Sequence, residues 1–281
     1  MSALQAIILA IVQGITELFP ISSLGHAVIM PALLGWKIDE NSQDFLPFLV
    51  VMHLGTAIAL LIYFWRDWWD FATAVLVRRG SKAEAERRLF WRVVVATVPA
   101  VVIGFVLEKQ LKHIFGAPLI AAGFLILNGL MLFVAERWKG RAARGLDGLR
   151  WSDALLIGLW QCLALIPGLS RSGATMAGGY LIGLDHEDAA RFSFLTATPI
   201  ILGATVLEAP KLMHHGAGAH GDAGSFSSVA ILAGVVAGVV AFASVALLMR
   251  WFKSHEARGF DPFAIYCWIA GAGSIAWLML R

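Results

Sequence analysis

An arginine, two serines and a threonine lie together in an otherwise apolar stretch of the chain, residues 166–175 (Ile-Pro-Gly-Leu-Ser-Arg-Ser-Gly-Ala-Thr). An arginine at membrane depth is costly unless an anion or water compensates its charge. The proline and the glycines interrupt the backbone and free N–H groups there. N–H groups, hydroxyls and a guanidinium together can bind an oxyanion, and phosphate is the first candidate. The alternative is an ordinary turn that carries an interfacial arginine.

A second polar cluster occupies residues 13–26 (Gln-Gly-Ile-Thr-Glu-Leu-Phe-Pro-Ile-Ser-Ser-Leu-Gly-His). Gln13 and Glu17 are four residues apart, so on a helix they project from the same face. Glu17 is the only carboxylate in the first 38 residues, and a buried carboxylate needs a cation nearby. Either Arg171 or a divalent metal ion would provide one.

Ser22, Ser23 and His26 follow Glu17 closely. A serine within reach of a histidine is the minimum for an activated nucleophile. Taken alone, such serines are more often helix caps, and a lone histidine is more often a hydrogen-bonded polar group. His53 lies in an apolar run near Gly55. It could line the same pocket or be a hydrogen-bonded core histidine.

The composition indicates what holds these residues in place. The chain has 281 residues, of which 59% are hydrophobic and 15% charged, with a mean hydropathy of +0.75. Soluble domains carry about 25% charged residues, so the sequence predicts an integral membrane protein with several spans. Membrane topology also explains the pI near 9.0, and no nucleic-acid partner is expected.

Six apolar runs are long enough to span a bilayer, and they cover residues 44–65, 91–108, 117–136, 190–208, 228–249 and 262–280. Two further apolar segments, 3–35 and 154–184, are interrupted by Pro, Gly and Ser near their middles. Broken segments of this kind are typical of re-entrant helix pairs that line a protein cavity. We therefore predict an all-α membrane protein with six transmembrane helices and two re-entrant pairs.

Loop charge predicts the orientation. Fourteen of the 22 basic residues fall in the loops after the first and third spans and before the last span, which six spans place on one side of the membrane. The segment 209–227, on the other side, has Lys211 alone. The positive-inside rule makes the three basic loops cytoplasmic and both termini external.

The two broken segments resemble each other at an offset of 148 residues, which places Gln13 on Gln161, Ser22 on Ser170 and Gly25 on Gly173. The offset predicts one membrane domain made of two repeats, residues 1–140 and 150–281. Each repeat has one re-entrant pair and three spans. Because three is odd, the second repeat is inverted, and the two broken loops would meet near the bilayer midplane.

The motifs Gln-Gly-x-x-Glu and Pro-x-Ser-Ser-x-Gly-His, followed later by Pro-Gly-x-Ser-Arg-Ser-x-x-Thr, resemble those of the undecaprenyl-diphosphate phosphatase family, also called the bacitracin-resistance phosphatases. The similarity extends over essentially the whole chain, including residues 191–195 and 261–266. The first motif of that family is a glutamate or glutamine followed four residues later by a glutamate. Here Gln13 takes the first place, so its expected role is polar support.

The resemblance implies hydrolysis of undecaprenyl diphosphate to undecaprenyl phosphate, which recycles the lipid carrier for cell-wall synthesis and confers bacitracin resistance. It also implies a multi-pass protein of the bacterial cytoplasmic membrane with an active site open to the external side. Glu17 would hold a divalent cation, Mg²⁺ or Ca²⁺, or orient His26. The expected catalytic residues are Ser23, His26, Glu17 and Arg171. The expected substrate-binding residues are Ser22, Gln13, Ser170, Ser172, Thr175 and Gly168.

Ser23 is the first choice of nucleophile, with His26 as its base or as the acid for the leaving group. Attack by His26 itself, or by water with Glu17 as base, stays open. A transporter of undecaprenyl phosphate or a related lipid is the alternative function, because broken inverted repeats are also typical of carriers. The sequence does not fix the oligomeric state, and a homodimer is one candidate.

Overall fold

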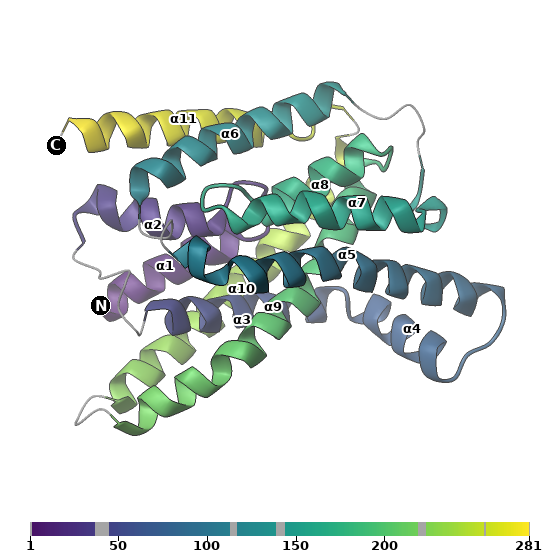
Figure 1. Cartoon of the computed structure of the whole chain (residues 1–281), viewed down its shortest axis with the longest axis horizontal. Coiled ribbons are helices and arrows are strands. Elements are labelled where there is room, and N and C mark those ends of the chain that lie inside the picture. The colour runs from purple at the N-terminus through teal and green to yellow at the C-terminus, as the bar shows by residue number, and fades with distance from the viewer. Residues whose placement is uncertain are drawn as a thin grey trace.

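The computed structural model describes residues 2–36, 45–112, 117–138, 144–218, 223–255 and 257–280. These residues are almost entirely helical, and their one β-bridge, between Arg144 and Leu184, is isolated. The all-α membrane architecture is therefore confirmed. The helices are α1 (Ala3–Thr16), α2 (Ser23–Leu34), α3 (Phe45–Tyr63), α4 (Trp65–Leu76), α5 (Ser81–Lys112), α6 (Pro118–Arg137), α7 (Trp151–Gln161), α8 (Arg171–Leu181), α9 (His186–Gly218), α10 (Ala223–Ser254) and α11 (Asp261–Met279), with 3-10 turns η1 (Leu146–Gly148) and η2 (Cys162–Leu165) (Figure 1).

Each of the six predicted spans coincides with a long helix. Within the described ranges, five helices (α5, α6, α9, α10 and α11) are individually long and apolar enough to cross a bilayer. Helix α3 passes that test together with α4, and the two are bent by 74°. The bent pair was not predicted, since the sequence placed a loop after residue 65. The charged residues of α4 lower its mean hydropathy, so the apolar-run criterion does not detect it, but its apolar residues Phe71 and Ala74 are buried.

The helix that carries the second span is longer than the predicted span, residues 91–108. Helix α5 begins ten residues earlier, at Ser81, and its first turns are polar, with Lys82, Glu84 and Arg87. Hydropathy detects only the apolar part of a helix, whereas the backbone hydrogen bonds continue beyond it. Several of the basic residues assigned to a loop therefore lie on the end of this helix.

Both interrupted segments are broken helices, as predicted. Helix α1 ends at Thr16 and α2 starts at Ser23, while α7 ends at Gln161 and α8 starts at Arg171. Ser22 has a φ of 69° and Gly168 a φ of 99°, so each break contains a residue in the left-handed region. Each second half-helix is capped by a serine, because Ser22 Oγ accepts from Gly25 N–H and Ser170 Oγ from Gly173 N–H.

Small residues allow close packing of the long helices. A Cβ added to Gly55 of α3 would lie 2.0 Å from the carbonyl oxygen of Gly234 in α10. In the same way, a Cβ on Gly158 of α7 would lie 2.5 Å from the carbonyl oxygen of Ala96 in α5. Close backbone approach of this kind is a main source of helix association in membranes.

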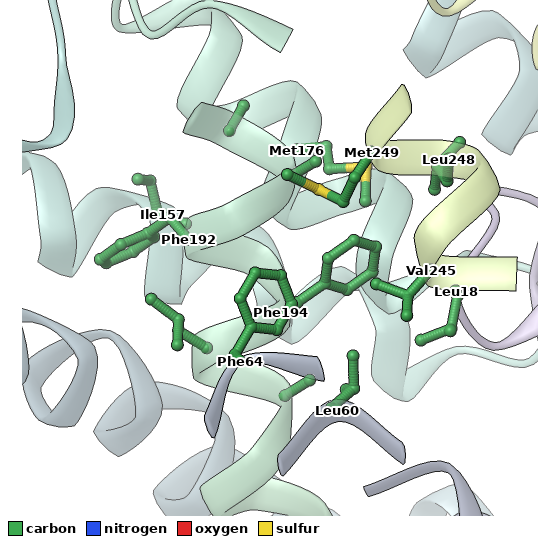
Figure 2. Packing of buried hydrophobic residues seen from close by; sticks show 14 of the residues in the cluster. Leu18, Leu60, Phe64, Ile157, Met176, Phe192, Phe194, Val245, Leu248 and Met249 are labelled. Carbon is green, nitrogen blue, oxygen red and sulfur yellow. The ribbon is translucent and has the colours of Figure 1, made fainter. Parts of the chain in front are cut away.

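The largest buried cluster joins α3, α8, α9 and α10. Figure 2 shows Phe64, Phe192 and Phe194 packed between Met176 and Leu60, with Met249 above them. These side chains are nearly or fully buried. The cluster therefore fixes the helices that carry His53, Arg171 and the start of α9 relative to one another.

Helix α1 packs on α10, and α7 packs on α5, while α3 packs on α9 and α6 on α11. Figure 1 shows α6 and α11 side by side along one edge. An inverted repeat would pair the halves in this way. The repeat boundaries, the re-entrant topology and the external position of the termini nevertheless stay predictions, because no membrane defines the two sides of the chain.

Candidate active site

The two broken segments meet through direct contacts. Ser22 Oγ donates a hydrogen bond of 3.3 Å to the carbonyl of Leu169, and Ser172 Oγ donates one of 3.1 Å to the carbonyl of Phe19. A Cβ on Gly25 would lie 3.1 Å from the Cα of Gly168, so the two backbones nearly touch. The N-termini of α2 and α8 are thereby brought to the same place in the molecule.

Asn128 of α6 holds both loops at once. Its amide nitrogen donates to the carbonyl of Pro20 at 2.8 Å, and its amide oxygen accepts from the N–H of Ser170 at 2.9 Å. The residue is fully buried. The sequence analysis missed it, although a lone asparagine inside the apolar run 117–136 was the available signal.

Glu17 is the hub of the site, with a side chain that is only 6% exposed. One carboxylate oxygen, Oε1, accepts from Nη2 of Arg171 at 2.8 Å. The other, Oε2, accepts from Oγ of Ser23 at 2.5 Å and from Nε2 of Gln13 at 3.1 Å. The structure therefore pairs Glu17 with Arg171, one of the two cations considered from the sequence. Gln13 provides the polar support expected of it.

His53 of α3 also contacts Glu17, with 3.2 Å between its Nε2 and Oε2 of the carboxylate. Its Nδ1 lies 2.7 Å from the carbonyl oxygen of Leu49. Because both ring nitrogens face acceptors, a doubly protonated imidazolium satisfies both contacts. Of the two interpretations of His53 left open by the sequence, its position favours the pocket-lining one.

The ring of His26 contacts groups other than the Ser23 hydroxyl, so the expected role of His26 toward Ser23 stays a prediction. His26 Nδ1 lies 2.7 Å from the carbonyl oxygen of Ser22, and Nε2 lies 2.7 Å from the hydroxyl of Tyr266 in α11. Residues three apart on a helix are neighbours on its surface, so the partners of the two side chains, and not their spacing, separate them. Ser23 and His26 are three residues apart on α2, and the hydroxyl of Ser23 points to Glu17 whereas the imidazole packs against α11.

A cavity of about 310 Å³ lies at the junction of the two loops. Its polar lining is formed by Glu17, Ser22, Ser23, His53, Gln161, Ser170, Arg171 and Thr205. Apolar residues of α2, α3, α5, η2 and α9 line the remainder. The cavity therefore combines a charged, hydroxyl-rich part with an apolar part, as a ligand with a polar head and a hydrocarbon chain would require.

Four of the expected substrate-binding residues do not line this cavity. Gln13 lies behind Glu17, and Ser172 is bonded to the first loop. Thr175 donates to the carbonyl of Arg171 at 2.8 Å and lies 2.5 Å from Oγ of Ser193. Gly168 is pressed against α6, where an added Cβ would lie 2.3 Å from the carbonyl oxygen of Ala121. These residues support the site from outside the cavity.

The donor set can be tested against a divalent metal. Glu17 is the only carboxylate among the described residues that line the cavity, and no group of three metal-binding side chains occurs in the described ranges. Magnesium is often held by one or two carboxylates together with substrate phosphates. The residues thus fit a cation that arrives with a diphosphate and has Glu17 as its protein ligand, but not a site built from protein ligands alone.

Comparison with known proteins agrees with these features. The chain is 54% identical to the undecaprenyl-diphosphatase of Acidiphilium cryptum, over 98% of each chain. It is 53% identical to that of Granulibacter bethesdensis, over 99% of this chain and 97% of the other. The undecaprenyl-diphosphatase 2 of Oenococcus oeni is 42% identical over 98% of each chain. The model of the family described as bacitracin resistance protein BacA matches residues 6–273. The chain therefore belongs to the BacA family.

Proposed function

We propose that this protein hydrolyses undecaprenyl diphosphate to undecaprenyl phosphate and inorganic phosphate. The name of its relatives in Acidiphilium cryptum and Granulibacter bethesdensis supports this substrate. The observation that carries the proposal is the contact of Glu17 with both Arg171 and Ser23 across the two loops. A base, a nucleophile and a cation meet there in one cavity that also has an apolar side.

Binding of the diphosphate is supported by the positive character of the cavity. Arg171 can form paired hydrogen bonds to phosphate oxygens, and a charged His53 adds a second cation against the single negative charge of Glu17. The N-termini of α2 and α8 also face the cavity through Ser22 and Ser170. Helix N-termini favour anions because their first N–H groups lack helical partners.

In the chemical step, Ser23 Oγ attacks the terminal phosphorus of the substrate, and its proton passes to Glu17. The bond between that phosphorus and the bridging oxygen breaks, so undecaprenyl phosphate leaves and a phosphoserine forms. Water then cleaves the phosphoserine and releases inorganic phosphate. Phosphoryl transfer depends chiefly on positioning and charge neutralisation, which Arg171 and the helix N-termini provide. The 2.5 Å contact between Ser23 and Glu17 supports Glu17, rather than His26, as the base.

Two other chemical routes stay open. Water could attack directly with Glu17 as base, in which case Ser23 would only bind substrate. His26 could act as nucleophile if its ring left Tyr266. When bound, Mg²⁺ or Ca²⁺ would neutralise diphosphate charge, and Glu17 would hold it.

We place the reaction in the bacterial cytoplasmic membrane, with the site open to the external side. A multi-pass chain is established by its helices and its family, while the basic loops of the sequence support this orientation. Such a location suits a substrate whose hydrocarbon chain stays in the bilayer. The membrane lipid is accordingly the expected environment, and a homodimer stays a candidate assembly.

The test measures phosphate release from purified, detergent-solubilised protein given undecaprenyl diphosphate, with and without EDTA. We expect Ser23→Ala and Glu17→Gln each to lower the rate by about 10²-fold or more, since base and nucleophile act as a unit. Acid-stable phosphate on Ser23 would identify the intermediate. EDTA should abolish release if the cation is required.

Specific outcomes would contradict each part. If Ser23→Ala lowered the rate of phosphate release by less than about tenfold, Ser23 would not be the nucleophile, because removal of a nucleophile lowers the rate far more. Full activity in EDTA would rule out a requirement for a divalent metal ion. If folded wild-type protein released no phosphate even with Mg²⁺ or Ca²⁺, the transporter would become the better explanation, and lipid movement in vesicles would be measured next.

A further inference from the structure

The apolar residues that line the cavity come from two groups of helices. One side is formed by Leu24, Leu49 and Val50, from α2 and α3. The other is formed by residues of α5, η2 and α9, namely Ala100, Leu165, Ile200, Ile201 and Ala204. A hydrocarbon chain attached to a diphosphate at Arg171 would have to leave the cavity along one of these two sides.

Burial distinguishes the two sides. On the first side, Leu49 and Val50 are 4% and 9% exposed and Leu24 is half-buried. On the second side, Ile201 is buried and Ala100, Leu165 and Ile200 are half-buried, whereas Ala204 is the one exposed residue among the described residues that line the cavity. The cavity therefore reaches the molecular surface between α5 and α9.

This surface is apolar on both flanks. Val101, Val102 and Phe105 of α5 are exposed, as are Val206 and Leu207 of α9. Exposed aliphatic side chains in a row on membrane-spanning helices are expected to face lipid. The opening therefore leads into the hydrocarbon of the bilayer rather than into water.

The sequence of both helices keeps this opening free. Pro99 and Pro199 stand directly before the lining residues Ala100 and Ile200, and a proline inside a helix removes one hydrogen bond and bends the axis. Gly203 adds no side chain, and a Cβ there would meet nothing within 4 Å. In Figure 1, α9 crosses α5 obliquely, and the two helices point in different directions beyond the crossing.

We propose that the prenyl chain of the substrate leaves the cavity between α5 and α9, with its first isoprene units on Ala100, Leu165, Ile200 and Ala204. This inference rests on the proposed function for the identity of the substrate. Arg171 contacts the carbonyl of Ser193 on α9, and Ala204 lies 11 residues further along that helix. At 1.5 Å per residue, the opening is about 16 Å from that contact.

A bulky side chain at the opening tests the proposal. Ala204→Trp and Ala100→Trp should raise the KM for undecaprenyl diphosphate by about tenfold or more, because an indole would occupy the path of the chain. Isopentenyl diphosphate, whose single isoprene unit ends inside the cavity, should be affected far less. Gly273→Trp on α11 is the matched control, since a Cβ at this lipid-facing glycine also meets nothing within 4 Å. Equal loss for long and short substrates, or an unchanged KM for the long one, would overturn the proposal.

A second measurement does not depend on hydrolysis. Undecaprenyl diphosphate with a photoreactive group on its second isoprene unit is irradiated with wild-type protein, and the labelled peptides are identified by mass spectrometry. Label in residues 98–106 and 200–207 is the expected result. Label confined to α2 and α3, or to other helices, would refute this exit. If label appears at α5 and α9 but phosphate is never released, the proposed hydrolysis fails while the lipid-binding path stands.

Discussion

The two broken segments have the same framework but carry different chemistry. In each, a glutamine lies in the last turn of the first half-helix and a serine caps the second half-helix, with Ser22 bonded to Gly25 and Ser170 to Gly173. The first segment adds Glu17 and Ser23, whereas the second adds Arg171 and no carboxylate. Under the proposed function, the first segment would supply the reacting groups and the second the cation that binds the substrate.

The comparison also shows how a common backbone can be used for two purposes. Nε2 of Gln13 donates to Glu17 at 3.1 Å, while Nε2 of Gln161 donates to the carbonyl of Ala96 in α5 at 3.2 Å. One glutamine thus orients a reacting group, and the other fastens α7 to a neighbouring helix. Equivalent positions have become different because the residues around them differ.

The largest effect is expected from removing the cation of the second segment. Arg171→Ala should lower phosphate release by about 10³-fold, a magnitude typical of arginines that stabilise phosphoryl transfer. Arg171→Lys keeps the charge but loses the planar pair of donors, so only partial activity should return. The rate is measured at saturating undecaprenyl diphosphate. Activity of Arg171→Ala near that of wild type would contradict the proposal that the second segment supplies the cation that binds the substrate.

Removing the link between the segments should have the next largest effect. Asn128→Leu leaves the carbonyl of Pro20 and the N–H of Ser170 without their partner, and each buried unpaired group costs about 1–3 kcal/mol. The melting temperature in detergent should fall. The value of kcat should change more than KM, because the loops would no longer hold Glu17 and Arg171 in the same relative position.

Ser274→Ala is the control for Asn128, because Ser274 is also buried and its hydroxyl donates within its own helix, to the carbonyl of Ala270. It should leave kcat close to wild type. If both variants lost stability and activity in the same proportion, Asn128 would be an ordinary buried polar group without a role in aligning the loops.

Gln13 and Gln161 offer a direct test of the difference between the two broken segments. Gln13→Leu should lower kcat by about tenfold through Glu17, and the loss of one hydrogen bond to a charged group should also lower the free energy of unfolding by about 1.5–3 kcal/mol. Gln161→Leu should lower the melting temperature more than kcat, since its amide holds α7 to α5. Both variants are compared in the same detergent and substrate series. The reverse pattern would mean that the cavity-lining Gln161 is the one that takes part in the reaction.

The smallest effect is expected at His26. Because its ring contacts Tyr266 rather than Ser23, His26→Ala should cost much less activity than Ser23→Ala. His26→Ala and Tyr266→Phe should be non-additive in stability, with a coupling of about 0.5–1.5 kcal/mol for one shared hydrogen bond. A loss in His26→Ala as complete as that in Ser23→Ala would show that the ring leaves Tyr266 and enters the reaction.

The sequence by itself determined the membrane class, the six long apolar helices and the two breaks, because apolar runs and the residues Pro, Gly and Ser act locally on the backbone. It also predicted that Glu17 would need a cation, either Arg171 or a divalent metal ion, since an unpaired charge is not tolerated in an apolar environment. Charged helix ends were misjudged, as α4 and the start of α5 show, because hydropathy records only the apolar part of a helix.

Tertiary structure alone decided which polar groups meet. Ser23 and His26 are neighbours on α2, yet one faces Glu17 and the other Tyr266, and no spacing rule distinguishes these partners. Asn128 and His53 join the site from α6 and α3, far along the chain from the motifs. Thr175 and Gly168 stand inside a motif but pack outside the cavity. Which residues share a cavity depends on how separate helices pack, and local sequence does not contain that information.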